Sequence, residues 1–253
     1  MLSVVIRSSS SYRTIWECRT MFKQPECDTC SSRLSTCLIE LAPLQVLEVS
    51  QEKHSQLYTR NSYIFAEGQY PRGIYCIHKG HVKISKIGPD GREHIINFAG
   101  TGDVVGYSSL LSAETYSISC IAVQDSSVCL IPSEIFFRNI RENPLMALHV
   151  MQHLASEVRH TRRRIVELTH KSIRERVAEA LLIMKEAFGV DSDGITLRSP
   201  LTREEIAGIV GTAPESVIRT LSEFRSDKLI ATNGRSIQLL NIRGLVHVAN
   251  IQS

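Results

Sequence analysis

The sequence predicts an α+β protein in which short strands are followed by a long helix and then by a helix-turn-helix with a β-hairpin wing. Three patterns predict this: alternating apolar residues with turn signals between 43 and 132, a heptad stripe of apolar residues after residue 147, and two short helical patterns joined at Gly211. Of the 253 residues, 43% are hydrophobic and 22% are charged, which is typical of a soluble globular protein.

The strand region covers about 43–132. Its segments are short, rich in Ile, Val and aromatic residues, and roughly alternating: SYIFAEG (62–68), GIYCIH (73–78), HVKISKI (81–87), REHIINF (92–98), YSISCIAV (116–123) and SVCLI (127–131). Turn signals separate them at Lys79-Gly80, GPDG (88–91) and GTGD (100–103). We expect no helix to interrupt this run, and strands at such even spacing predict a sandwich or a small barrel.

The long helix follows directly. Its apolar stripe steps alternately by four and three through Ala147, Met151, Leu154, Val158, Thr161, Ile165, Leu168 and Ser172. Such a heptad repeat is the pattern of a coiled-coil seam. We therefore expect a parallel homodimer that pairs through Met151, Leu154, Val158, Thr161, Ile165 and Leu168; an ordinary helix packed on its own domain is the alternative.

The last third is helical and then briefly β. SIRERVAEALLIMKEAF (172–188) has helical spacing, and two shorter helices each begin with a predicted capping box, Thr202 with Glu205 and Thr212 with Glu215. A tight turn containing Gly211 joins the short helices, which is the helix-turn-helix signature, although a plain helical hairpin has the same pattern. KLIATNGRSIQLLN (228–241) predicts two strands about the Asn233-Gly234 turn, forming a wing.

Charge and hydropathy limit the location and partners. The net charge of +3 is too small to indicate nucleic-acid binding, but seven basic residues face only two acidic ones between Arg159 and Arg176. No stretch reaches the roughly 18 apolar residues of a membrane span. We therefore expect a cytoplasmic protein with no membrane partner.

Seven cysteines, three of them in CDTCSSRLSTC (27–37), need an explanation. An odd count in a reducing compartment argues against a disulfide framework. A clustered C-x2-C pair there indicates metal or redox chemistry, and a tetrahedral zinc site remains possible. Cys76 and Cys120 lie in alternating strands, where we expect them to be small buried residues.

Taken in this order, a β-roll, a long dimer helix and a winged helix-turn-helix resemble the CRP/FNR superfamily of bacterial transcription regulators. The resemblance covers nearly all of residues 27–243 and is most specific in AGTGDVVGYSSLLSAETYSISCIAVQDSSVCLIP (99–132) and LTREEIAGIVGTAPESVIRTLSEF (201–224). It implies an N-terminal double-stranded β-helix, a jelly roll like that of cyclic-nucleotide-binding domains. The implied divisions are a flexible tail (1–26), a cysteine segment (27–42), a sensory β-roll (43–140), a dimerisation helix (141–171) and a DNA-binding domain (172–253).

The cyclic-AMP branch of that superfamily has a Gly-Glu pair followed by Arg-Ser, which hold the ribose and the cyclic phosphate. This chain instead reads Gly106-Tyr107-Ser108-Ser109, with TYSIS (115–119) where Arg-Ser would stand. Because a buried phosphate without a cation is costly to desolvate, we expect no cyclic nucleotide in the roll.

Oxygen-sensing FNR regulators carry a cysteine triplet ahead of the roll and one cysteine within it, which together hold a [4Fe–4S] cluster. The resemblance implies Cys27, Cys30, Cys37 and Cys129 as ligands, since Cys129 stands two residues ahead of Ile131-Pro132 as in that family. Thiolates are the ordinary ligands of such clusters. Six residues separate Cys30 from Cys37, where the family commonly has five, and Cys18 is the rival ligand.

The superfamily reads DNA with the motif E-[ST]-[IV]-x-R, here Glu215-Ser216-Val217-Ile218-Arg219. A carboxylate in the position of Glu215 accepts from a cytosine amino group, and Arg219 donates to guanine. Expected phosphate contacts are Thr202, Arg203, Thr212, Ser216 and Arg225. The resemblance implies an inverted-repeat site with TTGA-like half-sites.

The resemblance as a whole implies a homodimeric transcription regulator that binds double-stranded DNA, contacts RNA polymerase and is controlled by an oxygen-labile [4Fe–4S] cluster. A regulator of the same type that responds to a small molecule or to thiol oxidation in the roll is the alternative. No arrangement of a nucleophile, a base and an orienting group is found, so we do not expect an enzyme.

Overall fold

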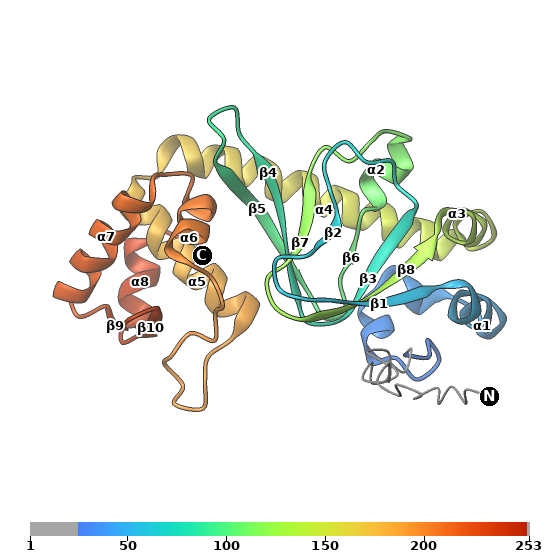
Figure 1. Cartoon of the computed structure of the whole chain (residues 1–253), viewed down its shortest axis with the longest axis horizontal. Coiled ribbons are helices and arrows are strands. Elements are labelled where there is room, and N and C mark those ends of the chain that lie inside the picture. The colour runs from blue at the N-terminus through green and yellow to red at the C-terminus, as the bar shows by residue number, and fades with distance from the viewer. Residues whose placement is uncertain (1–24, 252–253) are drawn as a thin grey trace, which may run out of the picture.

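The computed structural model describes residues 25–251 (Figure 1). A β-roll lies at one end of the molecule and a helical domain at the other, and the long helix α4 (Pro144–His170) runs from the first to the second. Two 3-10 helices, η1 (Ser31–Ser35) and η2 (Cys37–Glu40), precede α1 (Pro43–Glu52) at the N-terminal side of the roll. This arrangement confirms the predicted α+β fold class.

Two four-stranded antiparallel sheets form the roll, in the orders β1-β8-β3-β6 and β2-β7-β4-β5. Their strands are β1 (His54–Tyr58), β2 (Tyr63–Phe65), β3 (Gly73–Lys79), β4 (His81–Ile87), β5 (Glu93–Gly100), β6 (Val104–Val105), β7 (Ser119–Ala122) and β8 (Ser126–Pro132). Each of the six strands expected from the sequence is found, and β1 and β6 are additional. The small barrel or sandwich is therefore confirmed as two facing sheets.

The expectation that no helix interrupts this region is wrong. Helix α1 covers residues that we assigned to strands, and α2 (Tyr107–Ser112) lies between β6 and β7. Pro43 at the first position favours the start of α1, and Gln45 accepts a hydrogen bond from the backbone of Ala42 there. Helix α2 has only six residues, which is too short for a helical period to appear.

Helix α4 presents the predicted stripe to solvent. Met151, Val158 and Ile165 are 57%, 47% and 58% exposed, and Leu168 is also exposed. Ala147 and Leu154 are exceptions, since both are half-buried and Leu154 packs partly against the apolar core on the outside of the roll. Ser172 lies beyond the end of α4, where it caps the next helix, so the stripe is shorter than expected.

The helical domain contains α5 (Ile173–Phe188), α6 (Arg203–Val210), α7 (Pro214–Ser226) and α8 (Ile242–Val248), with β9 (Ile230–Asn233) and β10 (Ser236–Leu239) as the wing. Gly211 ends α6 at a φ of +69°, a left-handed conformation that glycine adopts without strain, and it turns the chain into α7. The helix-turn-helix and its wing are therefore confirmed.

The capping box at Thr202 and Glu205 is confirmed, but the second one is wrong. Thr202 accepts from the backbone of Glu205, whose side chain accepts from the backbone of Thr202. Helix α7 instead has Ala213 as its cap, without a side-chain hydrogen bond, and begins at Pro214. Proline is favoured at the first helical position, which moves the start of α7 past Thr212.

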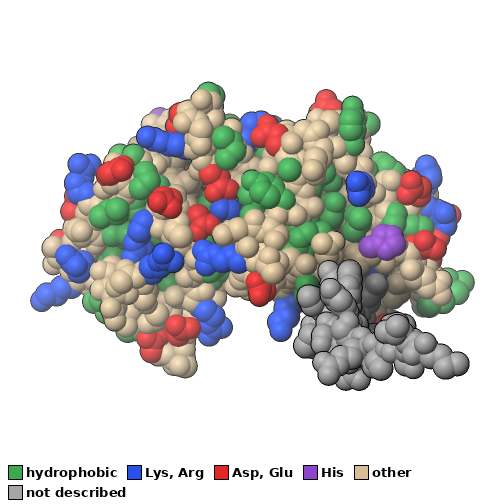
Figure 2. Space-filling view, in the orientation of Figure 1, with side chains coloured by type: hydrophobic (Ala, Val, Ile, Leu, Met, Phe, Trp, Pro, Cys, Tyr) green, Lys and Arg blue, Asp and Glu red, His purple; other side chains and the backbone are tan. Residues whose placement is uncertain are grey.

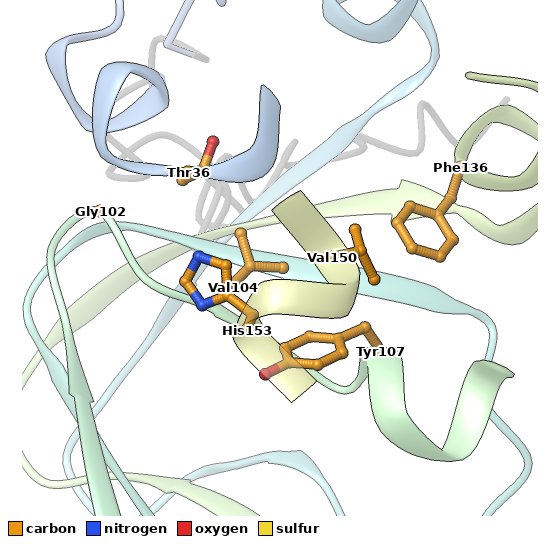
Figure 3. A pocket seen from close by; sticks show the side chains of 7 residues that line it. All are labelled: Thr36, Gly102, Val104, Tyr107, Phe136, Val150 and His153. Carbon is orange, nitrogen blue, oxygen red and sulfur yellow. The ribbon is translucent and has the colours of Figure 1, made fainter. Parts of the chain in front are cut away.

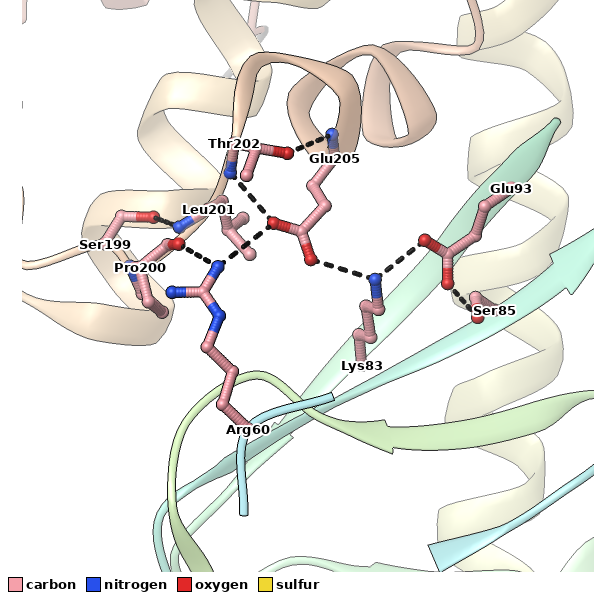
Figure 4. Close-up of polar contacts among 9 residues, drawn as sticks. All are labelled: Arg60, Lys83, Ser85, Glu93, Ser199, Pro200, Leu201, Thr202 and Glu205. Atoms are coloured by element: carbon pink, nitrogen blue, oxygen red, sulfur yellow. Dashed lines mark hydrogen bonds and ion pairs between the residues drawn. The ribbon is translucent and has the colours of Figure 1, made fainter. Parts of the chain in front are cut away.

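An ion-pair network joins the roll to the helix-turn-helix (Figure 4). Lys83 of β4 is buried, and its ammonium lies 2.7 Å from a carboxylate oxygen of Glu93 and 2.9 Å from one of Glu205 in α6. Arg60, after β1, lies 3.6 Å from Glu205 and donates to the carbonyl oxygen of Pro200 at 2.6 Å. The network therefore connects two strands of the roll to the first turn of α6.

Close packing surrounds this network. A Cβ at Gly208 of α6 would lie 2.7 Å from the carbonyl oxygen of Glu93, so only glycine allows this approach without a shift. At the end of α5, the ring of Phe188 packs against His81 and Phe98 of the roll, with ring centroids 5.1 and 5.3 Å apart. The helical domain is thus docked on β4 and β5 by both apolar and charged contacts.

Burial and ion pairing shift the pKa values of Glu205 and Lys83 in opposite directions. Burial alone would raise the pKa of Glu205, but the Thr202 backbone and Lys83 outweigh it and lower that pKa. Burial alone would lower the pKa of Lys83, and the carboxylates of Glu93 and Glu205 raise it instead. A carboxyl with a depressed pKa stabilises the fold above its ordinary pKa, and this contribution is lost as the pH falls through the folded value.

Replacing Lys83 tests the network. Lys83→Met leaves Glu93 and Glu205 without their buried cation, and we expect the free energy of unfolding to fall by about 3–5 kcal/mol. Lys86→Met is the matched control on the same strand, because the pair of Lys86 with Glu67 is about half exposed and is worth less than about 1 kcal/mol. Urea denaturation followed by circular dichroism measures both, and equal losses would contradict the assignment.

Candidate thiol site and nucleic-acid interface

The cysteine segment is held against the outer face of the sheet β1-β8-β3-β6. Ser32 donates to the carbonyl oxygen of His78 in β3 at 2.8 Å, and the backbone of Cys27 donates to Ser50 in α1 at 3.1 Å. Arg33 closes the segment on itself by donating to the carbonyl oxygens of Cys27 and Leu38. Leu38 is buried in the core that α1, α3 (Ser133–Glu142) and α4 share with this face.

Four cysteines line one cavity beneath this segment. Cys27 and Cys30 come from the segment, Cys76 from β3 and Cys129 from β8. The cavity encloses about 380 Å³ of empty space, part of it open to solvent. Cys27 and Cys129 are buried, and Cys30 and Cys76 are half-buried. Segments about one hundred residues apart in the sequence therefore bring their thiols to one place.

Polar groups contact each of three thiols. Lys53, only 4% exposed, donates to Cys27 Sγ at 3.3 Å and to the carbonyl oxygen of Pro25. Cys30 Sγ lies 3.4 Å from His78 Nδ1. In addition, Cys129 Sγ lies 3.2 Å from the hydroxyl of Ser55.

The charges of Lys53, Cys27 and Cys30 all affect the pKa of Cys129. Burial raises the pKa of Cys129, while the hydrogen bond from Ser55 and the charge of Lys53 lower it. Negative charge on Cys27 or Cys30 raises that pKa further, so the three thiols lie within electrostatic reach of one another. Ionising one of these thiols therefore disfavours ionising the next unless a cation is present.

His78 is the base nearest to Cys30. Burial lowers the pKa of His78, and the charges of Lys53 and Lys79 lower it further. Its imidazole is therefore neutral at neutral pH. A neutral ring nitrogen accepts a proton or binds a metal, whereas a protonated one does neither.

The four expected cluster ligands are described to different extents. The structure brings Cys27, Cys30 and Cys129 together, while Cys37 begins η2 and its side chain is not described. Cys18 lies outside the described residues. Within residues 25–251, no three His, Cys, Asp or Glu side chains are arranged so that they could hold a metal ion.

The prediction that Cys76 and Cys120 are small core residues holds for one of them. Cys120 is fully buried inside the roll, but Cys76 is half-buried on the outer face and lines the thiol cavity. The alternation along GIYCIH already separates Cys76 from Ile77, but which of the two faces carries the cysteine segment is not visible in the sequence. The burial of Lys53 beside Cys27 was not predicted either, because nothing in the sequence around a single lysine indicates that it is buried.

A second cavity lies between the cysteine segment, the roll and α4 (Figure 3). It encloses about 320 Å³ of empty space, including open solvent. Its lining is Thr36, Gly102, Val104, Tyr107, Phe136, Val150 and His153. Figure 3 shows His153 and Tyr107 close to each other, and together with Thr36 they give the lining three polar side chains in an otherwise apolar wall.

Aromatic side chains fill the interior of the roll. The rings of Phe65 and Tyr116 stack with centroids 3.9 Å apart, and Tyr75 lies 5.5 Å from Phe65. Ser119 accepts from the backbone of Glu67, so its hydroxyl already has a partner. No Lys or Arg occurs in residues 106–119, where a cyclic phosphate would need a cation.

The exposed face of α7 carries the residues expected to read bases. Glu215 and Arg219 are exposed, and Ser216 is half-buried. Val217 and Phe224 are fully buried in the core of the helical domain, so they fix the orientation of α7. In Figure 2, Lys and Arg side chains are scattered over this end of the molecule.

The expected phosphate contacts occupy several elements. The hydroxyl of Thr202 caps α6, Arg203 donates to the carbonyl oxygen of Gly234 in the wing at 3.3 Å, and Arg225 is exposed on the last turn of α7. Thr212 lies half-buried in the turn between α6 and α7. Among residues 25–251, no helix is both long and apolar enough to cross a bilayer.

The burial of the thiols predicts an order of modification. In metal-free protein at neutral pH, we expect iodoacetamide to modify the half-buried Cys30 and Cys76 first and Cys120 last, because burial excludes the reagent and raises the pKa of Cys120. Mass spectrometry of peptides over time measures the order. Early modification of Cys120 would contradict the packing of the roll.

Two domain families match the chain. Residues 55–143 match the cyclic nucleotide-binding domain, and residues 175–248 match the Crp-like helix-turn-helix domain. The first covers the roll, and the second covers most of the helical domain with its wing.

Curated relatives and a solved structure extend over most of the chain. The global nitrogen regulator of Synechococcus elongatus is 31% identical over 187 residues, covering 73% of this chain and 84% of that protein. The CRP-like cAMP-activated global transcriptional regulator of Mycobacterium tuberculosis is 26% identical, covering 77% and 88%. The transcriptional activator protein FnrA of Stutzerimonas stutzeri is 24% identical, covering 90% and 93%. The structure of FixK2 from Bradyrhizobium japonicum superimposes with a TM-score of 0.70 at 26% identity, covering 79% and 99%.

Proposed function

Because the chain belongs to the CRP/FNR family of DNA-binding transcription regulators, which are not enzymes, we propose that it is a homodimeric regulator controlled by an oxygen-labile [4Fe–4S] cluster. One observation carries this proposal: Cys27 and Cys30 of the N-terminal segment line the same cavity as Cys129 of β8. The similarity to FnrA supports the same branch of the family. The resemblance gives Cys37 as the fourth ligand, with Cys18 as its rival.

The donor set suits such a cluster. Clusters of this kind are held by cysteine thiolates, usually four, and here Cys27, Cys30 and Cys129 are among the four cysteines that line one cavity. The ammonium of Lys53 lies beside Cys27 and offsets part of the negative charge that several thiolates would bring into a buried site. When bound, the cluster would supply reactivity toward oxygen, while the protein's residues position it and limit its exposure.

The cysteine segment is in contact with the start of the dimer helix. Asn143 caps α4 by accepting from the backbone of Met146, and it also donates to the carbonyl oxygen of Glu40 in η2 at 2.6 Å. His149, one turn further along α4, lies 3.7 Å from the carboxylate of Glu40. Ligation that orders the segment therefore favours one position of α4, which couples the thiols to pairing of the helices.

DNA readout follows from the exposed face of α7. Members of this family bind DNA as dimers and contact RNA polymerase. In our proposal, Arg219 donates to guanine and Glu215 accepts from cytosine in adjacent base pairs of a TTGA-like half-site. Pro214 has no donor for a further base. Thr202, Arg203, Thr212, Ser216 and Arg225 contact phosphates and fix the register.

A cyclic nucleotide does not fit this proposal. The matched domain family and the mycobacterial relative both bear names that refer to cyclic nucleotides. In this chain, however, Phe65, Tyr75 and Tyr116 occupy the interior of the roll, and residues 106–119 offer no cation.

The alternative keeps DNA binding and changes the signal. One form of this alternative is a small molecule at the second cavity, where Tyr107 and His153 lie in the wall between the roll and α4. Oxidation of thiols in the first cavity is the other form of this alternative. Either would control the same DNA-binding domain without a cluster.

Substituting Arg219 tests the readout. We expect Arg219→Ala to weaken binding to the operator by about 1–3 kcal/mol and to relax specificity at one base pair. Arg225→Ala is the control on the same helix, and it should weaken binding to all sequences alike because phosphate contacts carry no sequence information. Fluorescence anisotropy at fixed salt measures both. Unchanged discrimination by Arg219→Ala would contradict the assigned contact.

Anaerobic purification tests the cluster. We expect about four irons and four sulfides per chain, with visible absorption that is lost in air, because four thiolates hold a cluster of this composition. Operator binding should fall on exposure to air. A metal-free or zinc-loaded protein that binds its operator equally with and without oxygen would exclude the cluster and leave the alternative signals.

A further inference from the structure

We propose that Cys76 is the fourth ligand of the metal group, so that β3 and β8 supply two thiolates and the cysteine segment supplies two. This inference rests on the proposed function, since it concerns the same cluster. It replaces Cys37, which only the family resemblance assigns. Neither the domain matches nor the named relatives single out Cys76.

The first argument is the direction of the Cys76 side chain. Tyr75 and Ile77, its neighbours in β3, are buried in the core inside the roll. Ile74 belongs to the core outside it, and Cys76 packs against that same outer core. Because successive side chains of a strand point to opposite faces, Cys76 faces the cysteine segment.

The second argument is the register of the sheet. Cys76 in β3 is paired directly with Cys129 in β8. Directly opposed residues in antiparallel strands have Cβ atoms about 4.5–5.5 Å apart. Cys129 is the ligand that the resemblance assigns within the roll, so Cys76 is the thiol that the sheet fixes beside it.

The third argument is the common cavity. Of the five cysteines whose side chains the structure describes, four line this cavity, and Cys120 lies fully buried inside the roll. Cys30 contacts His78, which follows Cys76 by two residues in β3 and lines the same cavity. The segment thiols therefore lie over the part of β3 that carries Cys76.

This arrangement has a mechanical consequence. Strands β3 and β8 each have a hydrogen-bonded neighbour on both sides, which makes them rigid. The cysteine segment instead consists of short 3-10 helices and turns. Two thiolates from paired strands give the metal group a fixed base, and binding then draws Cys27 and Cys30 toward it. The hydrogen bond from Ser32 to His78 already holds the segment on the sheet, and ligation of the group adds to this docking.

The test uses the full-length chain, loaded anaerobically with ferrous iron and sulfide. We compare the wild type with Cys76→Ala, Cys37→Ala and, as a matched control in the same roll, Cys120→Ala. We expect Cys76→Ala to lower the affinity for the group at least about tenfold, a loss that even outer-sphere substitutions produce, while the other two variants keep their iron and sulfide. Circular dichroism checks that each variant is folded.

An alkylation footprint of the wild type gives a second readout that needs no variant. In the loaded protein, iodoacetamide should leave Cys76 unmodified, and removal of the metal with a chelator should restore its modification. Full loading of Cys76→Ala, or modification of Cys76 that is equal with and without metal, would overturn the inference while the cluster stands. A wild-type chain that takes up no iron would overturn the proposed function itself, and this inference with it.

Discussion

The rest of the structure depends on the two different faces of the sheet β1-β8-β3-β6. Strand alternation directs Val128 of β8 into the roll and Cys129 out of it, and it divides Ile77 from Cys76 of β3 in the same way. The inner face closes the roll against the other sheet. The outer face carries the cysteine segment, α1, α3 and the start of α4, so the thiols lie among the elements that position α4.

Two routes connect the roll and its cysteine segment to the helix-turn-helix domain, and they differ in physical character. The first follows the chain: Asn143 ties the segment to the start of α4, whose far end leads into α5. The second crosses between the domains, where Lys83 pairs with Glu205 at the start of α6. Because α6 precedes α7 by one short turn, the second route fixes the orientation of the exposed Arg219 relative to the roll.

Local chemistry made the fold and its helix-turn-helix predictable, because Gly211, the capping box at Thr202 and the alternating strands act over a few residues. Helix α2 was not predicted because six residues are too few to show a helical period of apolar residues. The predicted capping box at Thr212 is wrong because Pro214 is favoured at the first position of the helix. The location of Cys76 could not be predicted, since it depends on pairing between β3 and β8, about fifty residues apart. Register between distant strands is not visible in either strand alone.

Lys53 links the cysteine segment to the roll through a buried charge. A buried ammonium is costly unless it is paired, and its partners are the Cys27 thiol of the segment and the carbonyl oxygen of Pro25 just before it. Lys53 itself follows α1 and leads into β1, so it belongs to the roll. Docking of the segment therefore satisfies this charge, and any change in the charge of Cys27 alters the free energy of docking. Because Glu40 of the same segment contacts Asn143 and His149, that free energy acts directly on the first turns of α4.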